Sequence, residues 1–207
     1  MSVDDTTTTC EQLPVDGRRA RRDRGRKAVT EATIDLVLEG HVPPTAEQVA
    51  ARAGVSVASL FRYFETLDEL RRATIQRYQE RIAHLTELAA IGEGLLDARV
   101  DSYVASRVRL YETTEPMAWL ARSRAVTVPA IDDSLHGARA TAAEQIRRHF
   151  GAELARLTPA RRDDLVALIA TTTSFESWLQ LRDDYGRNSS QTRRSWTSAL
   201  ERLLTAP

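Results

Sequence analysis

The sequence has little of what secreted and membrane-spanning proteins require. Its 207 residues include a single cysteine, Cys10, so no disulfide can form within the chain, as is typical of proteins in a reducing cytoplasm. No apolar run reaches the roughly 18 residues of a transmembrane helix. The first residues are acidic and polar and lack the apolar segment of a secretory signal. We therefore expect a cytoplasmic protein that makes no contact with a membrane.

Sequence signatures of catalysis and of cofactor binding are absent as well. There is no glycine-rich phosphate-binding loop and no G-x-S-x-G turn that would expose a nucleophilic serine. The histidines are scattered without metal-ligand spacing: His41, His84, His136 and His149. Two pairs of adjacent carboxylates, Asp132–Asp133 and Asp163–Asp164, lie near predicted helix starts, where they stabilise the helix dipole. The sequence thus predicts no enzyme, no metal site and no cofactor.

The most informative segment is residues 45–70, TAEQVAARAGVSVASLFRYFETLDEL. It predicts a short helix, a tight turn at Gly54, a second short helix capped by Ser56, and the start of a third helix. Two residue pairs have the spacing of helix capping boxes: Thr45 with Gln48, and Thr66 with Glu69. Apolar side chains, among them Leu60 and Phe64, are placed to form a core between the helices. Two short helices joined by such a turn are the sequence form of a helix-turn-helix.

The run GVSVASLFRYFETLDEL resembles the signature of TetR-type transcriptional regulators, in which a Gly-Val-Ser turn leads into a short recognition helix that ends in aromatic residues. The resemblance covers roughly residues 24–70. It implies a homodimeric DNA-binding regulator whose partner is double-stranded DNA with a palindromic operator. It also implies a repressor that a small-molecule effector releases from this operator.

Two alternatives stay open. The chain could be a constitutive DNA-binding regulator without a ligand, or a helical interaction module that does not bind DNA. The second alternative would leave the turn glycine, the helix caps and a cluster of arginines without a role.

The charge distribution favours nucleic acid although the formal net charge is zero. Seven cations fall within ten residues, opposed only by Asp23: Arg18, Arg19, Arg21, Arg22, Arg24, Arg26 and Lys27. A basic block beside a helix-turn-helix is the electrostatic pattern that phosphate binding needs. We expect residues 1–22 to be a disordered tail that ends in this basic arm. The arm either follows the DNA backbone, reaches into a minor groove, or is simply solvated.

Arg62 is the side chain of the recognition helix that can make a bidentate contact with guanine. A phosphate contact or a surface ion pair are its alternative roles. The resemblance gives Tyr63 a phosphate contact, whereas Phe61 stands where the family usually has tyrosine and Leu67 where it often has lysine. Both departures remove phosphate contacts. The residues expected to contact DNA are Arg24, Arg26, Thr45, Ala46, Ser56, Val57, Ala58, Ser59, Phe61, Arg62 and Tyr63.

Apolar periodicity and helix start and stop signals predict an all-α chain of about nine helices. We expect the tail 1–22, a three-helix helix-turn-helix domain over 23–70, and a helical ligand-binding and dimerisation domain over 71–207. Outside the two short helices, the predicted helices span about 24–38, 66–90, 95–113, 117–124, 132–150, 158–183 and 191–204.

The C-terminal part carries two further expectations. Its last two predicted helices are apolar on more than one side, and the resemblance implies that they pair with a second copy, with ordinary core as the alternative. The residues expected in this dimer interface are Thr172, Glu176, Leu179, Trp196, Leu200 and Leu203. The resemblance also implies a mostly apolar pocket, although aromatic residues at helical spacing are often plain core. The expected ligand-binding residues are Tyr103, Arg107, Tyr111, Trp119, Phe150, Thr171, Phe175 and Trp178.

Overall fold

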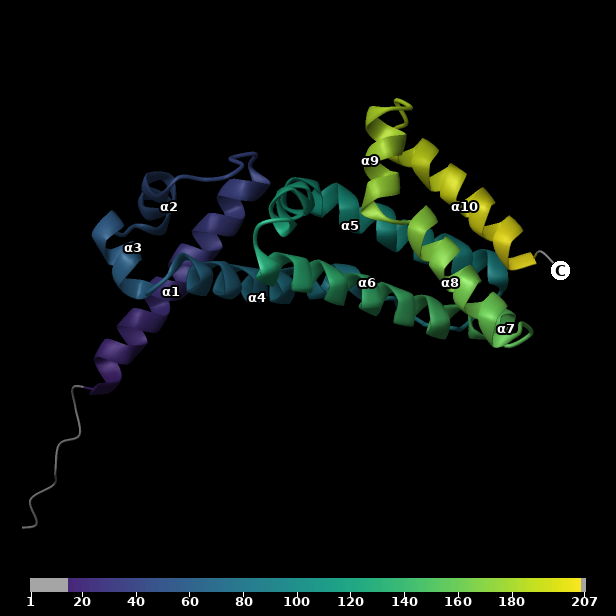
Figure 1. Ribbon diagram of the computed structural model, residues 1–207, viewed down its shortest axis with the longest axis horizontal. Coiled ribbons are helices and arrows are strands. Elements are labelled where there is room, and N and C mark those ends of the chain that lie inside the picture. The colour runs from purple at the N-terminus through teal and green to yellow at the C-terminus, as the bar shows by residue number, and fades with distance from the viewer. Residues whose placement is uncertain (1–14, 206–207) are drawn as a thin grey trace, which may run out of the picture.

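The computed structural model describes residues 15–205, which form ten α-helices and, within that range, no β-strand. The helices are α1 (Val15–Leu38), α2 (Ala46–Ala53), α3 (Val57–Tyr63), α4 (Leu67–Thr86), α5 (Leu96–Ala125), α6 (Pro129–His149), α7 (Gly151–Leu154), α8 (Pro159–Thr172), α9 (Phe175–Asp183) and α10 (Ser189–Thr205). Helices α1 to α3 form one end of an elongated molecule, α5 to α10 form the other, and α4 runs between them (Figure 1). The predicted all-α fold is confirmed, with one helix more than expected.

Local signals that the sequence predicts organise the N-terminal domain. Thr45 and Gln48 form a complete capping box, in which the Thr45 hydroxyl accepts from the Gln48 amide and the Gln48 side chain accepts from the Thr45 amide. Gly54 ends α2 at a φ of 67°, a left-handed conformation that glycine adopts without steric cost. Ser56 and Thr66 cap α3 and α4 through their side chains. The helix-turn-helix geometry therefore follows from short-range chemistry.

The core of this domain fixes α3 against α1 and α2. Leu60 and Phe64, both predicted to be core residues, are each 3% exposed. The other buried members of the cluster are Val29, Ala32, Leu36, Val49 and Ala50. Burial of one face of α3 leaves its opposite face to solvent.

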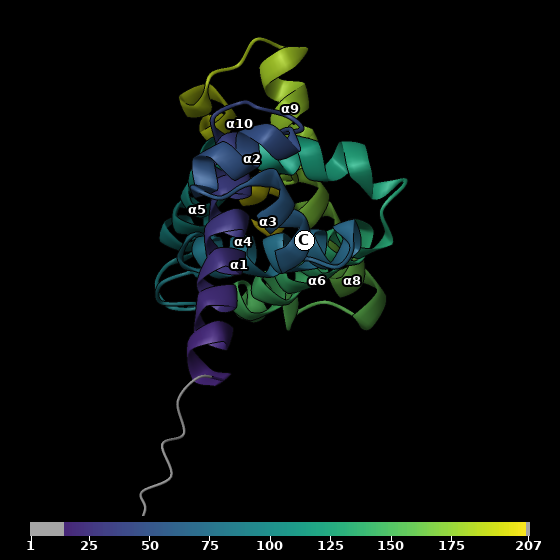
Figure 2. The same cartoon turned by 90° about the vertical axis from the view of Figure 1, so that its left-hand side faces the viewer.

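Helix α1 begins at Val15, well before the predicted start at residue 24. The prediction of a disordered tail is therefore wrong for residues 15–22, while residues 1–14, Cys10 included, lie outside the described residues. The arginine-rich segment contains no proline, and arginine is a good helix former, so the helix continues despite Gly17 and Gly25. The expected basic arm is thus part of a helix. The N-terminal half of α1 projects past α2 and α3 (Figures 1 and 2).

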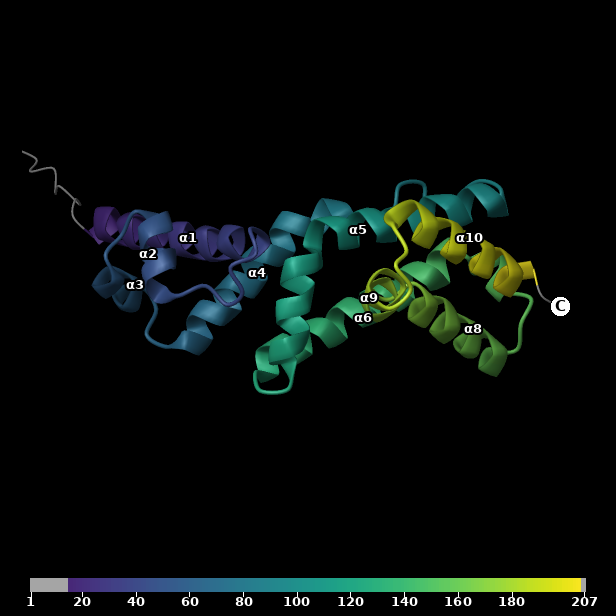
Figure 3. The same cartoon turned by 90° about the horizontal axis from the view of Figure 1, so that it is seen from above.

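Helix α5 runs for 30 residues through Pro116, where the sequence predicted two helices. A proline inside a helix removes one N–H donor and bends the helix without always ending it. Figure 3 shows α5 changing direction in its C-terminal part. Conversely, the helix predicted over 158–183 is divided into α8 and α9, because Ser174 caps α9 by accepting from the Ser177 amide. The four-residue helix α7 was not predicted.

A second hydrophobic core lies among helices α5 to α10. Trp196 is 2% exposed and Leu200 is 0% exposed, so both pack inside a single protomer. The prediction that these two residues form a dimer interface is therefore wrong, since apolar periodicity identifies the buried face of a helix but not the partner that buries it. Within residues 15–205, none of the helices combines the length and apolarity needed to cross a membrane.

Candidate functional site

The solvent-facing side of α3 carries a row of polar side chains one helical turn apart. Ser56 Oγ donates to Ser59 Oγ at 3.0 Å, and Arg62 Nη2 donates to the same Ser59 oxygen at 3.1 Å. Ser56 and Arg62 are exposed and Ser59 is half-buried. Within the described part of the chain, Arg62 forms no ion pair with a carboxylate and Ser59 is its side-chain partner. Most of its guanidinium donors are thus available to a base edge or a phosphate.

Small and apolar side chains flank this polar row. Ala58 is exposed, and Val57 is half-buried against the domain core. Phe61 is 54% exposed. Alanine and valine methyl groups at such positions can touch a thymine methyl, so the face of α3 combines a polar row with apolar neighbours.

Tyr63, at the end of α3, is packed tightly on α1. A Cβ atom on Gly25 would lie 2.4 Å from Tyr63 Cζ, so the ring occupies the space of the absent side chain. Arg26 Nη1 donates to the Tyr63 carbonyl at 2.7 Å and to Glu69 Oε1 at 2.5 Å. The Arg26 guanidinium also stacks 4.3 Å from the centre of the Phe64 ring. Together these contacts hold the recognition helix in place.

The contacts of Arg26 correct two predictions. Arg26 was expected to contact DNA, but its guanidinium is engaged by Tyr63, Phe64 and Glu69 within the domain. Glu69 was expected to close a capping box with Thr66. Its amide does donate to the Thr66 hydroxyl, but its carboxylate accepts from the amide of Glu65 and from Arg26.

The remaining cations of α1 lie on all sides of its N-terminal half, because their positions are distributed around the helix turn. This basic segment contains six exposed residues: Arg18, Arg19, Arg21, Arg22, Arg24 and Lys27. Arg22 Nη2 lies 3.9 Å from Glu65 Oε1 in an exposed pair, and such pairs contribute only about 0–1 kcal/mol. The contact between Gly25 and Tyr63 places this basic segment next to the recognition helix. At the start of α2, Thr45 is exposed and Ala46 half-buried.

Helix α4 connects the N-terminal domain to the rest of the chain through charged contacts. Arg77 of α4 pairs with Glu31 of α1, and Arg81 pairs with Asp35 at 2.5 Å and with Glu31 at 3.6 Å. No residue of α4 is fully buried. These ion pairs tie α4 to α1.

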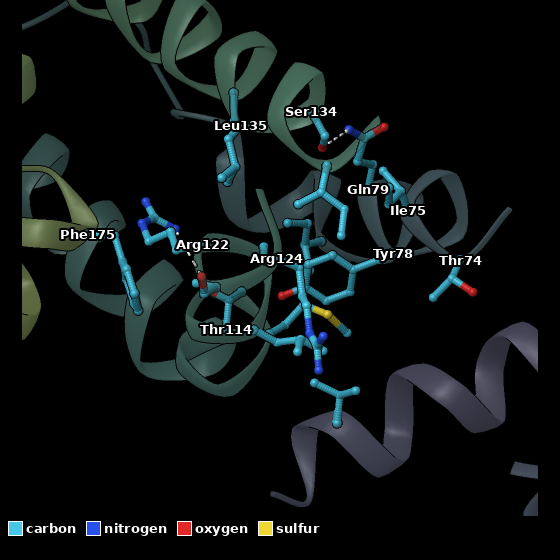
Figure 4. Close-up of a pocket in the computed structure, with 18 of the residues that line it drawn as sticks. Thr74, Ile75, Tyr78, Gln79, Thr114, Arg122, Arg124, Ser134, Leu135 and Phe175 are labelled. Atoms are coloured by element: carbon cyan, nitrogen blue, oxygen red, sulfur yellow. Dashed lines mark hydrogen bonds between the residues drawn. The ribbon is translucent and has the colours of Figure 1, made fainter. Parts of the chain in front are cut away.

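A cavity of about 1270 Å³ lies against α4. Side chains from three helices converge on it, among them Tyr78 of α4, Thr114 of α5 and Leu135 of α6 (Figure 4). The end of α8 and the start of α9 close another side, and the lining reaches α1 to α3. This volume exceeds the roughly 300–1,000 Å³ of common ligand pockets, so a drug-sized molecule fits.

Most of the residues predicted to bind a ligand line this cavity: Tyr103, Arg107, Tyr111, Thr171 and Phe175. The prediction is wrong for Trp119, Phe150 and Trp178. Trp119 is 53% exposed to solvent, whereas Phe150 and Trp178 are 0% exposed and fill the core. Sequence reasoning missed the walls formed by α4 and α6, because helical periodicity does not distinguish a cavity wall from filled core.

Glu176 lies in the cavity wall, and its expected contact with a second copy stays a prediction. It accepts hydrogen bonds from Arg122 Nε at 2.8 Å and from Arg139 Nη2 at 3.2 Å. Burial alone would raise the pKa of Glu176, but these arginines lower it to about 2. Its charge is thus satisfied within one protomer. The other predicted interface residues, Thr172, Leu179 and Leu203, are half-buried and keep part of their surface exposed.

Among solved structures, those with the same architecture include TetR-family transcriptional regulators. A TetR-family transcriptional regulator from Streptomyces coelicolor superposes with a TM-score of 0.70 at 19% identity, over 87% of this chain and 80% of that chain. Salmonella enterica GusR gives a TM-score of 0.60 at 19% identity, over 97% and 100%. The multidrug binding protein EbrR, complexed with imidazole, gives 0.59 at 18% identity, over 88% and 96%. The chain therefore has a helix-turn-helix fold with a helical second domain, and this fold is that of the TetR family.

Sequence similarity to curated proteins is confined to part of the chain. An uncharacterized HTH-type transcriptional regulator of Mycobacterium tuberculosis is 38% identical over 58 residues, which are 28% of this chain and 30% of the relative. HTH-type transcriptional regulator PksA of Bacillus subtilis is 30% identical over 102 residues, which are 48% of this chain and 50% of that protein. The chain thus spans half the length of these relatives or less. No family model matches it.

Proposed function

We propose that the chain is a DNA-binding transcriptional regulator that acts in the cytoplasm as a homodimer on a palindromic operator. The observation that carries this proposal is the solvent-facing row of Ser56, Ser59 and Arg62 on a capped short helix, flanked by the basic segment of α1. In helix-turn-helix proteins such a helix meets base edges in the major groove while its flanks meet phosphates. The likeness in fold to TetR-family regulators supports the same function.

The proposal includes release from the operator by a small molecule, which would make the protein a repressor. The cavity against α4 supports this part, because α4 is ion-paired with α1. A ligand that binds one conformation better than another shifts the equilibrium toward that conformation. If the conformations differ in the position of α4, ligand binding changes the arrangement of the two recognition helices. A constitutive regulator without a ligand is the alternative.

Selection of DNA from a random-sequence pool by the purified full chain tests the DNA-binding part. We expect enriched inverted repeats whose half-sites are about one helical turn, roughly 34 Å, apart. If no sequence were enriched after repeated rounds, DNA binding would have to be abandoned.

The proposed dimer surface consists of the partly exposed apolar residues of α8 and α10, and it includes Leu168, which is 52% exposed. Light scattering should give twice the chain mass of 23.1 kDa. Leu168→Arg should give the monomer mass. Val126→Arg, at a position that is 92% exposed between α5 and α6, is the matched control and should remain dimeric. A monomeric wild-type chain would contradict the dimer.

A further inference from the structure

Two arginines of α5 are buried equally but have different partners. Arg99 and Arg107 are each 6% exposed. Arg99 pairs with Glu153 at 2.5 Å and also donates to the His149 carbonyl at 2.7 Å. Within residues 15–205, Arg107 has no carboxylate partner. It donates to the neutral amide oxygen of Gln145, and its Nε has no hydrogen-bond partner.

The position of Arg107 links this missing partner to the cavity. A buried charge is unfavourable unless it is paired and hydrogen-bonded, and Arg99 shows how this chain meets that requirement elsewhere. Arg107 lines the cavity, and its guanidinium lies 5.1 Å from the centre of the Tyr103 ring. Its positive charge therefore faces the space in which a ligand would sit.

The rest of the cavity wall does not supply the missing negative charge. The wall contains five arginines but, among acidic residues, only Asp133 and Glu176. Glu176 is already paired with Arg122 and Arg139. Asp133 is exposed near the start of α6, and it lies about 18 Å along the helix from Gln145, the residue that contacts Arg107. The cavity is thus electropositive around Arg107.

The remaining lining is mostly apolar, with a few polar groups. Its apolar members include Leu110, Met117, Ile131, Leu135 and Phe175. Two further buried polar atoms of the lining, Thr74 Oγ1 and the Tyr78 hydroxyl oxygen, have no hydrogen-bond partner. Figure 4 shows both residues on the α4 side of the cavity. An apolar wall with unpartnered polar atoms fits an amphipathic ligand.

We propose that the effector is an amphipathic organic carboxylate: its anionic group pairs with Arg107, and its apolar body lies against the aliphatic and aromatic wall. This inference rests on the proposed function, since it names the chemical class of ligand for the same cavity. A carboxylate matches the planar guanidinium donors in a way that an alcohol does not.

Gln145 connects Arg107 to helix α4. Its Nε2 donates to the carbonyl of Thr86, the last residue of α4, while its Oε1 accepts from Arg107. A carboxylate that takes donors of Arg107 competes with Gln145 for them. Binding of the anion therefore acts, through one side chain, on the end of the helix that is ion-paired with α1.

Matched ligands test the proposal on the full chain. Each set of ligands shares one apolar part and differs in its polar group. Dodecanoate, dodecanol and dodecylamine form the first set, and naphthalene derivatives with a carboxylate, an alcohol or an amine group form the second. We expect only carboxylates to raise the melting temperature and to release DNA. Arg107→Gln should weaken carboxylate binding by about tenfold or more, and Arg107→Lys should restore part of it. Arg109→Gln, at an exposed position of the same helix, is the matched control and should change nothing.

A second variant keeps Arg107 in place. Gln145→Glu supplies a carboxylate beside Arg107 from within the protein, so carboxylates should bind about as weakly as to Arg107→Gln. Equal binding of alcohols or amines, or carboxylate binding that survives both substitutions, would overturn the inference while leaving a ligand-responsive regulator intact. If no member of either set bound, the carboxylate inference would fail as well. Selection of DNA would then still decide the proposed function independently.

Discussion

The ring of Tyr63 occupies the volume that a side chain at Gly25 would need, with Tyr63 Cζ 2.4 Å and its hydroxyl oxygen 2.8 Å from the position of a Cβ. Helices α1 and α3 are therefore in tight contact where the basic segment of α1 meets the recognition helix. This contact joins two parts of the proposed DNA-binding surface into one unit.

Gly25→Ala should disturb that unit. The added methyl group collides with the Tyr63 ring, and overpacking of this kind costs about 1–3 kcal/mol. We expect a lower midpoint of chemical denaturation and weaker DNA binding. Gly17→Ala is the control in the same helix, because a Cβ there meets nothing within 4 Å, and removing a helical glycine stabilises by about 0.5–1 kcal/mol. Equal stability of the two variants would argue against the close packing.

Arg26→Met should act on stability rather than on phosphate binding. The side chain of Arg26 is 26% exposed and bonds both Glu69 and the Tyr63 carbonyl, so its loss should cost about 1–2 kcal/mol, between the values for exposed and buried pairs. Glu69→Gln should have a similar effect in urea denaturation. The slope of log DNA affinity against log salt concentration should not change in either variant. A shallower slope for Arg26→Met would instead indicate a direct phosphate contact.

Arg24→Ala should give the opposite pattern. Arg24 is exposed in the basic segment of α1, so its removal should leave the denaturation midpoint unchanged. If Arg24 contacts a phosphate, the negative slope of log affinity against log salt should become shallower by about 0.9, the value for one released counterion on duplex DNA. Binding measured at several salt concentrations checks this, and an unchanged slope would show that Arg24 remains solvated.

Folding stability should depend on the protonation of His149, which is 1% exposed. Its Nδ1 accepts from the Gly92 amide at 3.1 Å, so its Nε2 carries the proton that it donates to the Arg99 carbonyl at 2.9 Å. Burial lowers the pKa of His149. Below about pH 6.5, the ordinary value, the unfolded chain therefore binds a proton that the folded chain does not.

The free energy of unfolding should thus be highest above about pH 6.5 and decrease as the pH falls below it. His149→Gln should flatten this dependence below about pH 6.5. The control His84→Gln, at an exposed position of α4, should preserve it. Denaturation curves at a series of pH values make the comparison, and an identical pH dependence in the wild type and His149→Gln would refute this role of the buried imidazole.

The sequence predicts those parts of the fold that short-range chemistry determines. The caps at Thr45 and Ser56 and the turn at Gly54 act within a few residues, and the structure has them where they were expected. The fate of Arg26 depends on Glu69, which lies 43 positions away. No local pattern distinguishes a cation that holds a helix from one that faces DNA.

The same limit applies to the C-terminal domain. Trp196 has the spacing of an interface residue, yet it packs inside its own protomer, since periodicity does not identify the partner. Tyr103 of α5 and Phe150, which lies between α6 and α7, both belong to the core, but of the two Tyr103 alone also lines the cavity. The length of α5 depends on whether its surroundings tolerate the bend at Pro116.

The most direct measurement is fluorescence anisotropy of labelled DNA, comparing the sequence selected from a random pool with a scrambled duplex across a salt series. The wild type should bind the selected duplex far more tightly. Arg62→Ala should weaken that binding by about 1–3 kcal/mol and relax the preference at one base pair. Arg187→Ala, at an exposed position between α9 and α10, should behave as the wild type. Equal binding of both duplexes, unchanged by Arg62→Ala, would contradict sequence recognition by α3.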